Sequence, residues 1–244
     1  PAHDPNDFEV GKRHNLEELC IMHDDATIDC PGSKYDKMDR YEARKAMVED
    51  LKAQGLLVKV VPHRHNVGTH DRCKSTVEPM IKQQWFVKME EMAKPAISAI
   101  ENGDLQFIPE SYGKTYLHWL ENIKDWCISR QLWWGHRIPA YYFMNADGKR
   151  DCVVAETEEA ALEKAKAKNC NLELKDLEQE SDCLDTWFSS WLWPISVFDG
   201  INNPNNKEID YYYPTSDLVT GPDIIFFWVA RMIMAGYEYR KTYP

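Results

Sequence analysis

The chain has 244 residues, of which 43% are hydrophobic and 12% aromatic, and this composition excludes a disordered or collagen-like protein. No apolar run approaches the roughly 20 residues that cross a bilayer, and no signal-peptide pattern opens the chain, so we expect a soluble, cytoplasmic protein. With 29 basic and 40 acidic residues, the formal net charge is −11, which by itself disfavours a nucleic-acid partner.

The charge is distributed unevenly along the chain. Residues 1–50 carry 7 basic and 13 acidic side chains, residues 51–150 carry 14 and 10, and residues 151–200 carry 4 and 12. A basic middle suits contact with phosphates, and ordinary variation of surface charge explains it equally well. The net charge therefore decides little about a nucleic-acid partner.

The first third of the chain predicts two helices and a strand. Asp4 is a helix cap followed by proline, and Asp7 then complements the helix dipole. A loop rich in Asp, Gly and Pro leads to a second helix, which Asp39 caps and Gly55 ends. Residues 56–61 then read as a strand.

The remaining elements alternate between helix and strand. We expect a helix at 85–100, a strand at 105–108, a helix at 116–124 and an extended segment at 127–142. The composition then changes, and residues 144–182 read as a surface insertion with a Glu/Lys/Ala helix at 157–168. A strand at 218–220, a glycine-containing turn and a helix at 224–235 suggest a βα unit of an α/β nucleotide-binding sheet.

Three strings of residues carry chemical information. The first, at 128–139, is Ile-Ser-Arg-Gln-Leu-Trp-Trp-Gly-His-Arg-Ile-Pro, in which the tryptophans alone would read as core packing. The second, at 185–190, is Asp-Thr-Trp-Phe-Ser-Ser. A strand end with a hydroxyl-rich turn explains it, but its flat indole also suits contact with a small branched side chain.

The third string, at 220–228, is Thr-Gly-Pro-Asp-Ile-Ile-Phe-Phe-Trp. Gly221 permits close approach of the backbone to a flat ring, and Asp223 can accept hydrogen bonds from both hydroxyls of a ribose. A turn followed by an ordinary helix cap would explain the Gly-x-Asp pair alone, so the signal rests on the aromatic continuation.

In this order, the three strings resemble the class I aminoacyl-tRNA synthetases of the valine, isoleucine and leucine group. Residues 77–80 and 84–86 look like the exit from that group's editing domain, and residues 3–8 resemble its hydrolytic pocket. The resemblance covers nearly the whole chain except the insertion at 144–182.

Within the group, the second string is similar to the valine enzymes. Thr186, Ser189 and Ser190 match their pattern, whereas isoleucine enzymes usually show Val and an Asp-Ser ending. An isoleucine enzyme is therefore the alternative within the family. A non-catalytic tRNA-binding module derived from a synthetase is the other alternative. A dehydrogenase is disfavoured because no Gly-x-Gly-x-x-Gly turn occurs.

The resemblance implies an α/β fold that joins part of a class I Rossmann-like catalytic domain to the C-terminal portion of a β-rich editing domain. The implied divisions are 1–75 for the end of the editing (CP1) domain, 76–125 for the connection back to the catalytic core, 126–143 for a catalytic segment, 144–182 for the insertion, and 183–244 for the catalytic segment with the adenosine and valine pockets.

The resemblance also implies a reaction. ATP with Mg²⁺ activates valine to valyl-adenylate, and the acyl group passes to tRNA(Val). Site residues carried over from the family are Gly221 and Asp223 for adenosine, Trp187 and Ile224 for the valine side chain, and Arg130, Gln131, Trp134 and Gly135 as active-site support.

A second, hydrolytic site belongs to the same resemblance. A hydrophobic pocket rejects threonine in favour of valine by only about a hundredfold, so the family hydrolyses mischarged threonyl-tRNA. Asp7 would bind the α-ammonium group of the mischarged residue, while His3 and Asp4 would shape the pocket. Helix capping is the alternative explanation for Asp4.

The family's two ATP signatures are not found in this sequence. His-Ile-Gly-His would lie upstream, and Lys-Met-Ser-Lys-Ser would follow Pro244. We therefore expect an internal fragment that neither forms adenylate nor charges tRNA alone, cut from an enzyme that is monomeric when complete.

The seven cysteines include no Cys-x-x-Cys pair, which indicates reduced thiols. Some relatives carry such pairs near His70 and Cys73 and in the insertion. A tetrahedral metal site needs four ligands, or three and a water molecule. We expect no bound zinc, with His70 and Cys73 as the weak candidates.

Overall fold

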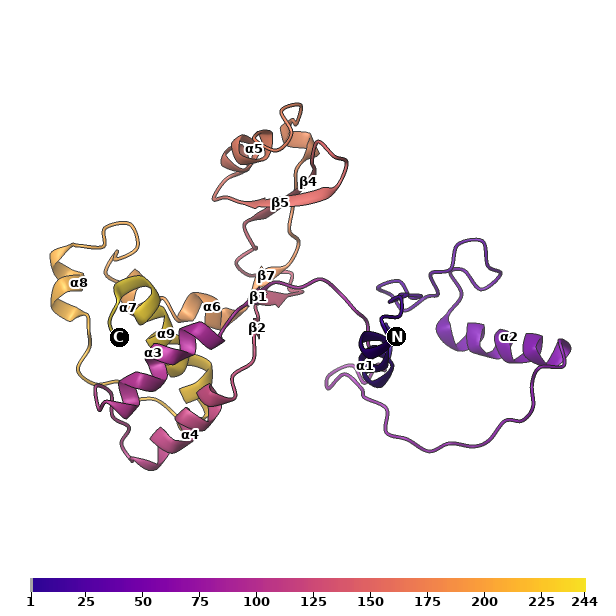
Figure 1. Ribbon diagram of the computed structural model, residues 1–244, viewed down its shortest axis with the longest axis horizontal. Helices are drawn as coiled ribbons and strands as arrows, with labels where there is room; N and C mark the ends of the chain where they lie inside the picture. Colours follow the sequence, from indigo (N-terminus) through magenta and orange to yellow (C-terminus); the bar gives the residue numbers. More distant parts are fainter. Residues whose placement is uncertain (1) are drawn as a thin grey trace. The chain divides into compact units, whose positions relative to one another are not determined.

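The computed structural model describes residues 2–244, and the chain divides into two compact units, Pro1–Gln83 and Gln84–Pro244 (Figure 1). Helices and strands both occur, so the expected mixed α and β composition is confirmed. Within the described residues, no helix has the length and apolar character needed to cross a bilayer.

The first unit contains two helices, α1 (Pro5–His14) and α2 (Arg40–Ala53). The carboxylate of Asp4 accepts hydrogen bonds from the backbone N–H groups two and three residues on, and that of Asp39 does the same for α2. These bonds satisfy N–H groups that a helix leaves without intrahelical partners. Both predicted helices and their caps are confirmed.

The predicted strand at 56–61 is wrong. The segment is extended, and Val58 is 93% exposed. Among its described residues, the first unit has only the isolated bridges Met22–Ile28, Thr27–Asp39 and Thr69–Thr76, so the expected β-rich character is not seen there. A strand exists only with a partner, and no described segment lies in register beside residues 56–61.

The second unit is built around three helices, α3 (Glu90–Glu101), α4 (Ser111–Glu121) and α9 (Ala230–Ala235), which pack together (Figure 1). Their apolar faces enclose a core whose most buried large side chains include Tyr116, Met89, Leu120 and Met234. Burial of these side chains removes apolar surface from water and is the main favourable term in the stability of this unit.

Three predicted elements of this unit shift or disappear. The helix predicted at 85–100 begins only at Glu90, because β1 (Phe86–Val87) pairs antiparallel with β2 (Trp126–Cys127). The helix predicted at 116–124 lies at 111–121 instead. The strand predicted at 105–108 is irregular chain, and Ile108 is 95% exposed.

A small sheet forms a separate module within the second unit. Its strand order is β5-β4-β6, both pairings are antiparallel, and α5 packs against it (Figure 1). The module has its own core, which includes Tyr141, Phe143 and Ala161. Its elements are β4 (Ala140–Met144), β5 (Arg150–Val154), α5 (Glu158–Lys166), η1 (Leu174–Asp176) and β6 (Glu178–Gln179).

The predicted βα unit near the C-terminus is also wrong in its first part. Residues 218–220 form no strand, and Val219 is 94% exposed. Every sheet among the described residues is antiparallel, so no parallel Rossmann-type pairing is present in them. A parallel strand needs a neighbour reached by a crossover connection, and no described strand lies beside residues 218–220.

Short helical turns supply the rest of the second unit. The turn after Gly221 becomes a 3₁₀ helix and then a π-helix before α9 begins. The elements are α6 (Thr186–Ser190), α7 (Trp193–Ser196), α8 (Lys207–Tyr212), η2 (Pro222–Ile224), η3 (Ile225–Val229) and η4 (Gly236–Arg240).

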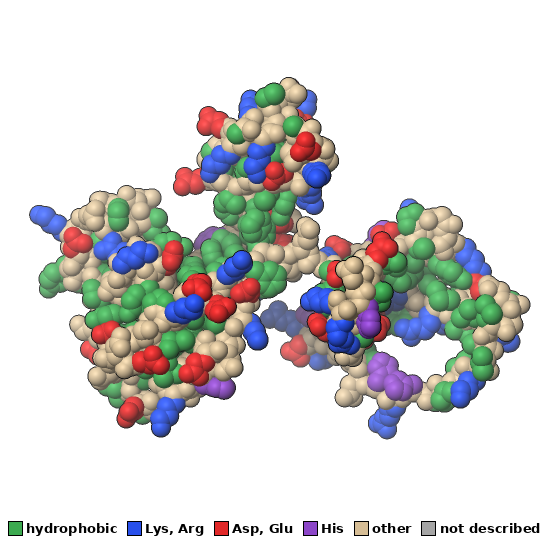
Figure 2. Space-filling view, viewed as in Figure 1, with side chains coloured by type: hydrophobic (Ala, Val, Ile, Leu, Met, Phe, Trp, Pro, Cys, Tyr) green, Lys and Arg blue, Asp and Glu red, His purple; other side chains and the backbone are tan. Residues whose placement is uncertain are grey.

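Hydrophobic side chains reach the surface between the charged ones in both units (Figure 2). Those more than nine-tenths exposed are Val58, Ile108, Trp133 and Val219. Three of these four lie in segments that the sequence predicted as strands, which is where side chains lose burial when a strand lacks its neighbour.

Candidate functional site

The first two strings of residues lie side by side in the structure. Strand β3 (Ser129–Arg130) pairs antiparallel with β7 (Cys183–Leu184). Just beyond these strands, the N–H of Asp185 donates to the carbonyl of Ile128 over 2.7 Å, and the N–H of Leu184 donates to the carbonyl of His136 over the same distance. The backbone therefore fixes residues 128–136 against 183–185.

A charge cluster around the buried carboxylate of Asp185 joins all three strings. Asp185 is 7% exposed, and its Oδ2 accepts the indole N–H of Trp126 at 2.8 Å. The guanidinium nitrogens of Arg130 and Arg231 lie 3.2 and 3.6 Å from the same oxygen. Arg130 belongs to the first string, Asp185 begins the second, and Arg231 follows the third.

Arg231 is the most unusual member of this cluster. Its guanidinium lies 3.6 Å from the ring centre of Trp126, an arrangement that favours a desolvated cation. Burial lowers the pKa of Arg231 to about 10, which the nearby Asp185 carboxylate partly opposes. The side chain therefore stays positive at neutral pH. Neither Arg231 nor Asp185 was given a role from the sequence.

Arg130 and Gln131 both make hydrogen bonds to neighbouring groups of the protein. Arg130 donates from one nitrogen to the carbonyls of Cys127 and Ser129 at 2.9 and 2.8 Å, in addition to its contact with Asp185. Gln131 donates to the carboxylate of Asp182 at 2.7 Å. The contacts with Asp185 and Asp182 hold the two neighbouring strand segments together.

Trp134 and Gly135 sit on an outward loop with Trp133. The indoles of Trp133 and Trp134 are 91% and 84% exposed, with ring centres 6.2 Å apart. A Cβ at Gly135 would lie 2.9 Å from the Cβ of Cys183, closer than real side chains approach. Glycine is therefore required at 135 for the loop to pass β7.

His136 is a further residue of the site to which the sequence assigned no role. Its Nδ1 lies 2.7 Å from the hydroxyl of Ser189, so the imidazole ties the first string to helix α6. Its position directly after Trp-Gly in the first string was the available signal. Ser189 is one of the residues that favoured the valine enzymes.

The second and third strings also meet. The rings of Trp187 and Phe227 stack with centres 6.3 Å apart and planes 23° apart. The indole N–H of Trp228 donates to the carbonyl of Ser190 at 3.2 Å. Trp187 is half-buried, and so is Ile224 at the end of the turn.

Gly221 and Asp223 lie on the exposed side of the same turn. A Cβ placed on Gly221 would meet no atom within 4 Å, so nothing in the described residues fills that space. The turn thus combines an exposed carboxylate, an open approach to the backbone and a nearby apolar surface from Trp187 and Ile224. This combination can accept a flat polar ring and a small apolar group.

A separate cavity of about 520 Å³ opens beside the charge cluster. It is lined by Trp119, Trp126, Phe226, Arg130 and Arg231, together with residues of the 122–127 segment. None of the four residues carried over for adenosine and valine lines it. The cavity and the turn at 221–224 are therefore two distinct surfaces of the second unit.

The residues expected for the hydrolytic pocket lie at the start of α1. His3 bridges two segments, since its Nδ1 lies 2.9 Å from the carbonyl of Pro79 and its Nε2 accepts the N–H of Ile21 at 2.9 Å. Asp4 caps the helix. The side chain of Asp7 is exposed, and among the described residues it makes no hydrogen bond or ion pair, so its carboxylate is available to a ligand.

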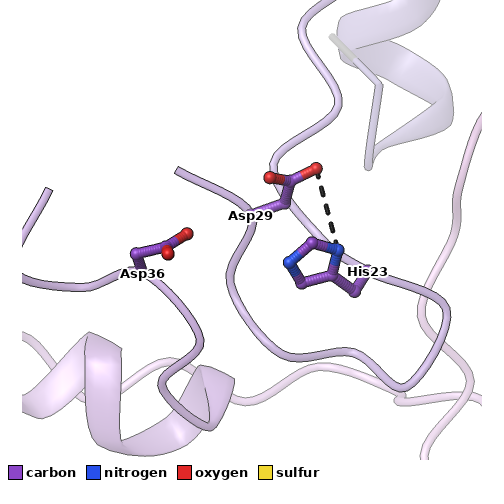
Figure 3. A group of neighbouring side chains, drawn as sticks. All are labelled: His23, Asp29 and Asp36. Atoms are coloured by element: carbon purple, nitrogen blue, oxygen red, sulfur yellow. Dashed lines mark ion pairs between the residues drawn. The ribbon is translucent and has the colours of Figure 1, made fainter. Parts of the chain in front are cut away.

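A further cluster of side chains in the first unit was not predicted from the sequence. His23, Asp29 and Asp36 converge from one loop, with their nitrogen and oxygen ligand atoms all within 4.8 Å of one another (Figure 3). His23 Nδ1 lies 3.8 Å from Asp29 Oδ2, and Asp36 accepts the backbone N–H of Cys30 at 3.0 Å. The last bond closes the loop, which gives Asp36 a structural role independent of any metal.

His70 and Cys73 also lie close together, with Nδ1 3.1 Å from Sγ. They supply two of the four ligands of a tetrahedral zinc site. The described residues bring no third His, Cys, Asp or Glu donor to this pair.

The sequence was compared with known proteins. A family model described as tRNA synthetases class I (I, L, M and V) matches residues 6–244. The valine–tRNA ligase of Parabacteroides distasonis is 57% identical over 246 residues, which cover all of this chain and 28% of that protein. The enzyme of the same name from Clostridium tetani is 55% identical over 244 residues, covering all of this chain and 26% of that protein. The chain thus spans less than a third of the length of these relatives.

Proposed function

The chain belongs to the class I tRNA synthetases of the isoleucine, leucine, methionine and valine group, and from this premise we propose that it acts within a valine–tRNA ligase. The observation that carries the proposal is identity of 55–57% along the entire chain to relatives named as valine–tRNA ligases. Because the match covers 28% of such a relative, the complete reaction is assigned to a longer polypeptide that includes these residues.

The proposed reaction has two steps. Valine and ATP, with Mg²⁺ at the phosphates, form valyl-adenylate and pyrophosphate, and the acyl group then passes to the terminal adenosine of tRNA(Val). Gly221 and Asp223 would hold the adenosine, and Trp187 and Ile224 would contact the valine side chain. Support comes from the open backbone at Gly221, the exposed carboxylate of Asp223 and the half-buried indole of Trp187.

The residues of the first string would position this site. Arg130 contacts Asp185, which directly precedes α6, and His136 contacts Ser189 inside α6. Trp187 lies between these two anchors. We propose that Arg130, Gln131, Trp134 and Gly135 fix the location of the valine-contacting indole, since rigid support around a binding group preserves its geometry.

The choice of valine over isoleucine rests on α6. Thr186, Ser189 and Ser190 follow the valine pattern, and Ser189 and Ser190 both have defined partners in His136 and in the carbonyl of Thr186. The Ser189 contact ties α6 to the first string, and the Ser190 bond lies within α6. The valine enzymes among the relatives agree with this choice by name.

The first unit is proposed to belong to the hydrolytic domain that clears threonyl-tRNA(Val). Asp7 is the candidate ligand for the α-ammonium group, because its carboxylate is exposed and is not used by the helix cap. Asp4 and His3 would act structurally, through the cap and through the bridge between Ile21 and Pro79. The domain division carried over from the family, with the insertion at 144–182 between two catalytic segments, is part of this proposal.

A chimera tests the synthetic function. The chain would replace the matching residues of the Parabacteroides distasonis enzyme, with which it shares 57% identity. We expect the chimera to catalyse valine-dependent ATP–pyrophosphate exchange, and the 244-residue chain alone to show none. Asp223→Asn in the chimera should lower exchange by at least about thirtyfold, since a lost charged contact to a ligand costs roughly 2–5 kcal/mol.

Asp217→Asn is the matched control, because Asp217 is an exposed acid four residues before the turn. It should leave exchange unchanged. Exchange that is specific for isoleucine would replace the valine assignment with the isoleucine alternative, and a chimera that binds tRNA without any exchange would favour the non-catalytic module.

The hydrolytic function is tested on the same chimera. Asp7→Ala should abolish deacylation of threonyl-tRNA(Val) while valine-dependent exchange persists. Glu17→Ala, a change at another exposed acid of the first unit, is the control. Equal deacylation by the two variants would remove Asp7 from the proposed pocket.

A further inference from the structure

The turn at residues 69–76 places a histidine against a cysteine on the surface of the first unit. Thr69 and Thr76 form an isolated antiparallel bridge, and the N–H of His70 donates to the carbonyl of Ser75 at 2.8 Å. The N–H of Lys74 donates to the carbonyl of His70 at 2.9 Å. These bonds close a short hairpin that fixes the side chains within it.

Inside this hairpin, two groups of Cys73 approach the same imidazole nitrogen of His70. The backbone N–H of Cys73 donates to Nδ1 of His70 at 3.3 Å, so this nitrogen acts as an acceptor. The thiol sulfur lies 3.1 Å from the same nitrogen. A thiol in this position can pass its proton to the imidazole.

The sulfur has a second polar neighbour. The hydroxyl of Ser75 lies 3.3 Å from Sγ and can donate to a thiolate. Hydrogen bonds from the Ser75 hydroxyl and backbone N–H are the largest causes that lower the pKa of the Cys73 thiol to about 7; desolvation opposes them, and His70 adds a smaller lowering. The same turn carries three charged side chains, of which Asp71 and Lys74 pair with each other at 3.5 Å and Arg72 directly precedes Cys73.

We propose that Cys73 is a nucleophilic modification site that reacts selectively with low-molecular-weight disulfides, with His70 as its base. In the reaction, the Cys73 thiolate attacks one sulfur of the disulfide R–S–S–R. The Cys73–S–S–R bond forms, the S–S bond of the reagent breaks, and R–S⁻ leaves with the electron pair. The thiol proton passes to Nδ1 of His70. The exposed position of Cys73 gives the reagent access.

The other exposed cysteines lack this arrangement. Cys20 donates to the carbonyl of Met22 and Cys170 to the side-chain oxygen of Asn171, each at 3.7 Å. Cys30 is exposed on a loop of the same unit as Cys73 and has no imidazole within hydrogen-bond distance among the described residues. Cys30 is therefore an internal reference for Cys73 in the same molecule.

The size of the effect follows from thiolate chemistry. At pH 7, a thiol with a pKa of about 7 has about fiftyfold more thiolate than one at the ordinary value of 9.0. Each thiolate is about eightfold less nucleophilic because of its lower basicity. The net expectation is that Cys73 reacts about sixfold faster than Cys30.

The test uses the full chain and oxidised glutathione at pH 7, with acid quenching and peptide mass spectrometry. The initial rate of mixed-disulfide formation at Cys73 is divided by that at Cys30. We expect a ratio of about six. In His70→Asn, whose amide oxygen still accepts the Cys73 N–H but is no base, the ratio should fall below that of the unmodified chain but stay above one, because the Ser75 hydrogen bonds remain. His63→Gln, a change at another exposed histidine, should keep it.

A ratio of one or less in the unmodified chain overturns the proposal, and so does an unchanged ratio in His70→Asn. Amide exchange at Val77, whose N–H donates to the carbonyl of Gly68 at 3.0 Å, reports whether the hairpin persists in the variant. If amide exchange at Val77 accelerates in His70→Asn, the ratio is measured in Ser75→Ala instead, because this substitution leaves every backbone hydrogen bond of the turn in place. A lowered ratio in Ser75→Ala supports the proposal, and an unchanged ratio overturns it.

Discussion

The two units of this chain are held together by different means. All three hydrophobic clusters lie in Gln84–Pro244, and so do all nine tryptophans. In the first unit, the buried hydrophobic residues among those described are Ala2 and Ala43, whose methyl side chains remove little area from water. The second unit has a core, and the first unit has caps, ion pairs and short loops.

The overall composition of the chain describes neither unit. The 43% hydrophobic content predicted a substantial core, yet Leu56 and the three valines at 56–61 remain exposed in the first unit. Polar contacts hold that unit instead, such as the Arg40–Glu78 pair at 2.5 Å and the bridge through His3. Tryptophan fluorescence therefore reports on the second unit alone, and the two units can be measured separately.

The largest expected effect comes from removing a buried indole of the second unit. Trp191 is 2% exposed and contacts the rings of Trp126, Phe188 and Tyr239. Trp191→Ala should lower the free energy of unfolding by about 4 kcal/mol, through lost burial and the cavity left behind. Urea unfolding followed by tryptophan fluorescence measures this change.

Trp133→Ala is the matched control, because Trp133 is 91% exposed. It should change the free energy of unfolding by no more than about 0.5 kcal/mol. Equal effects of the two substitutions would mean that the aromatic cluster does not stabilise the second unit. The claim that a hydrophobic core distinguishes the second unit from the first would then be wrong.

The next effect tests the one charged cluster inside the aromatic core. Asp185→Asn leaves the guanidinium groups of Arg130 and Arg231 near each other without their shared carboxylate. Breaking the buried pair between Asp185 and Arg231 from one side costs about 3 kcal/mol, because the charge of Arg231 stays desolvated. The same urea experiment should show this loss, while Asp217→Asn at an exposed acid should not. A stabilised Asp185→Asn variant would show that desolvation outweighs the attraction.

Local signals in the sequence predicted the helices well. Asp4 and Asp39 marked the starts of α1 and α2, because an N-cap depends only on residues within one turn. Strands fared worse, since 56–61, 105–108 and 218–220 form none. A strand depends on a distant partner, and no pattern within six residues reveals whether that partner is present.

The candidate site also contains some features that the sequence predicted and others that it did not. The three strings identified the residues that meet around α6, since their order and identity were specific. The contacts of Asp185 with Arg130 and Arg231 were not visible in the sequence, because they join residues about 50 positions apart. The roles of Gly221, Asp223, Trp187 and Ile224 toward a substrate stay predictions.

In the first unit, loss of a single cap should matter because so little else stabilises α2. Asp39→Ala removes the acceptor for the N–H groups of Tyr41 and Glu42, and should cost about 1 kcal/mol. Amide hydrogen exchange within α2 should then accelerate about fivefold. Exchange in α3 of the second unit is the internal control and should not change. An acceleration shared by α3 would show that the two units unfold together.

The smallest effect is a pH dependence confined to the first unit. Hydrogen bonds from Lys34 and then Tyr35 hold the pKa of Asp50 below its ordinary value of 3.8. A lowered folded pKa means that the carboxylate stabilises the unit above about pH 4, and that this contribution disappears as the pH falls through the folded value. The unmodified chain and Asp50→Asn should therefore differ in α2 exchange above about pH 4 and converge below it. Asp71→Asn, at a fully exposed acid paired only with Lys74, should show no such convergence in α2. A constant difference between the chain and Asp50→Asn across this range would mean that the Lys34 and Tyr35 contacts stabilise α2 independently of the charge on Asp50.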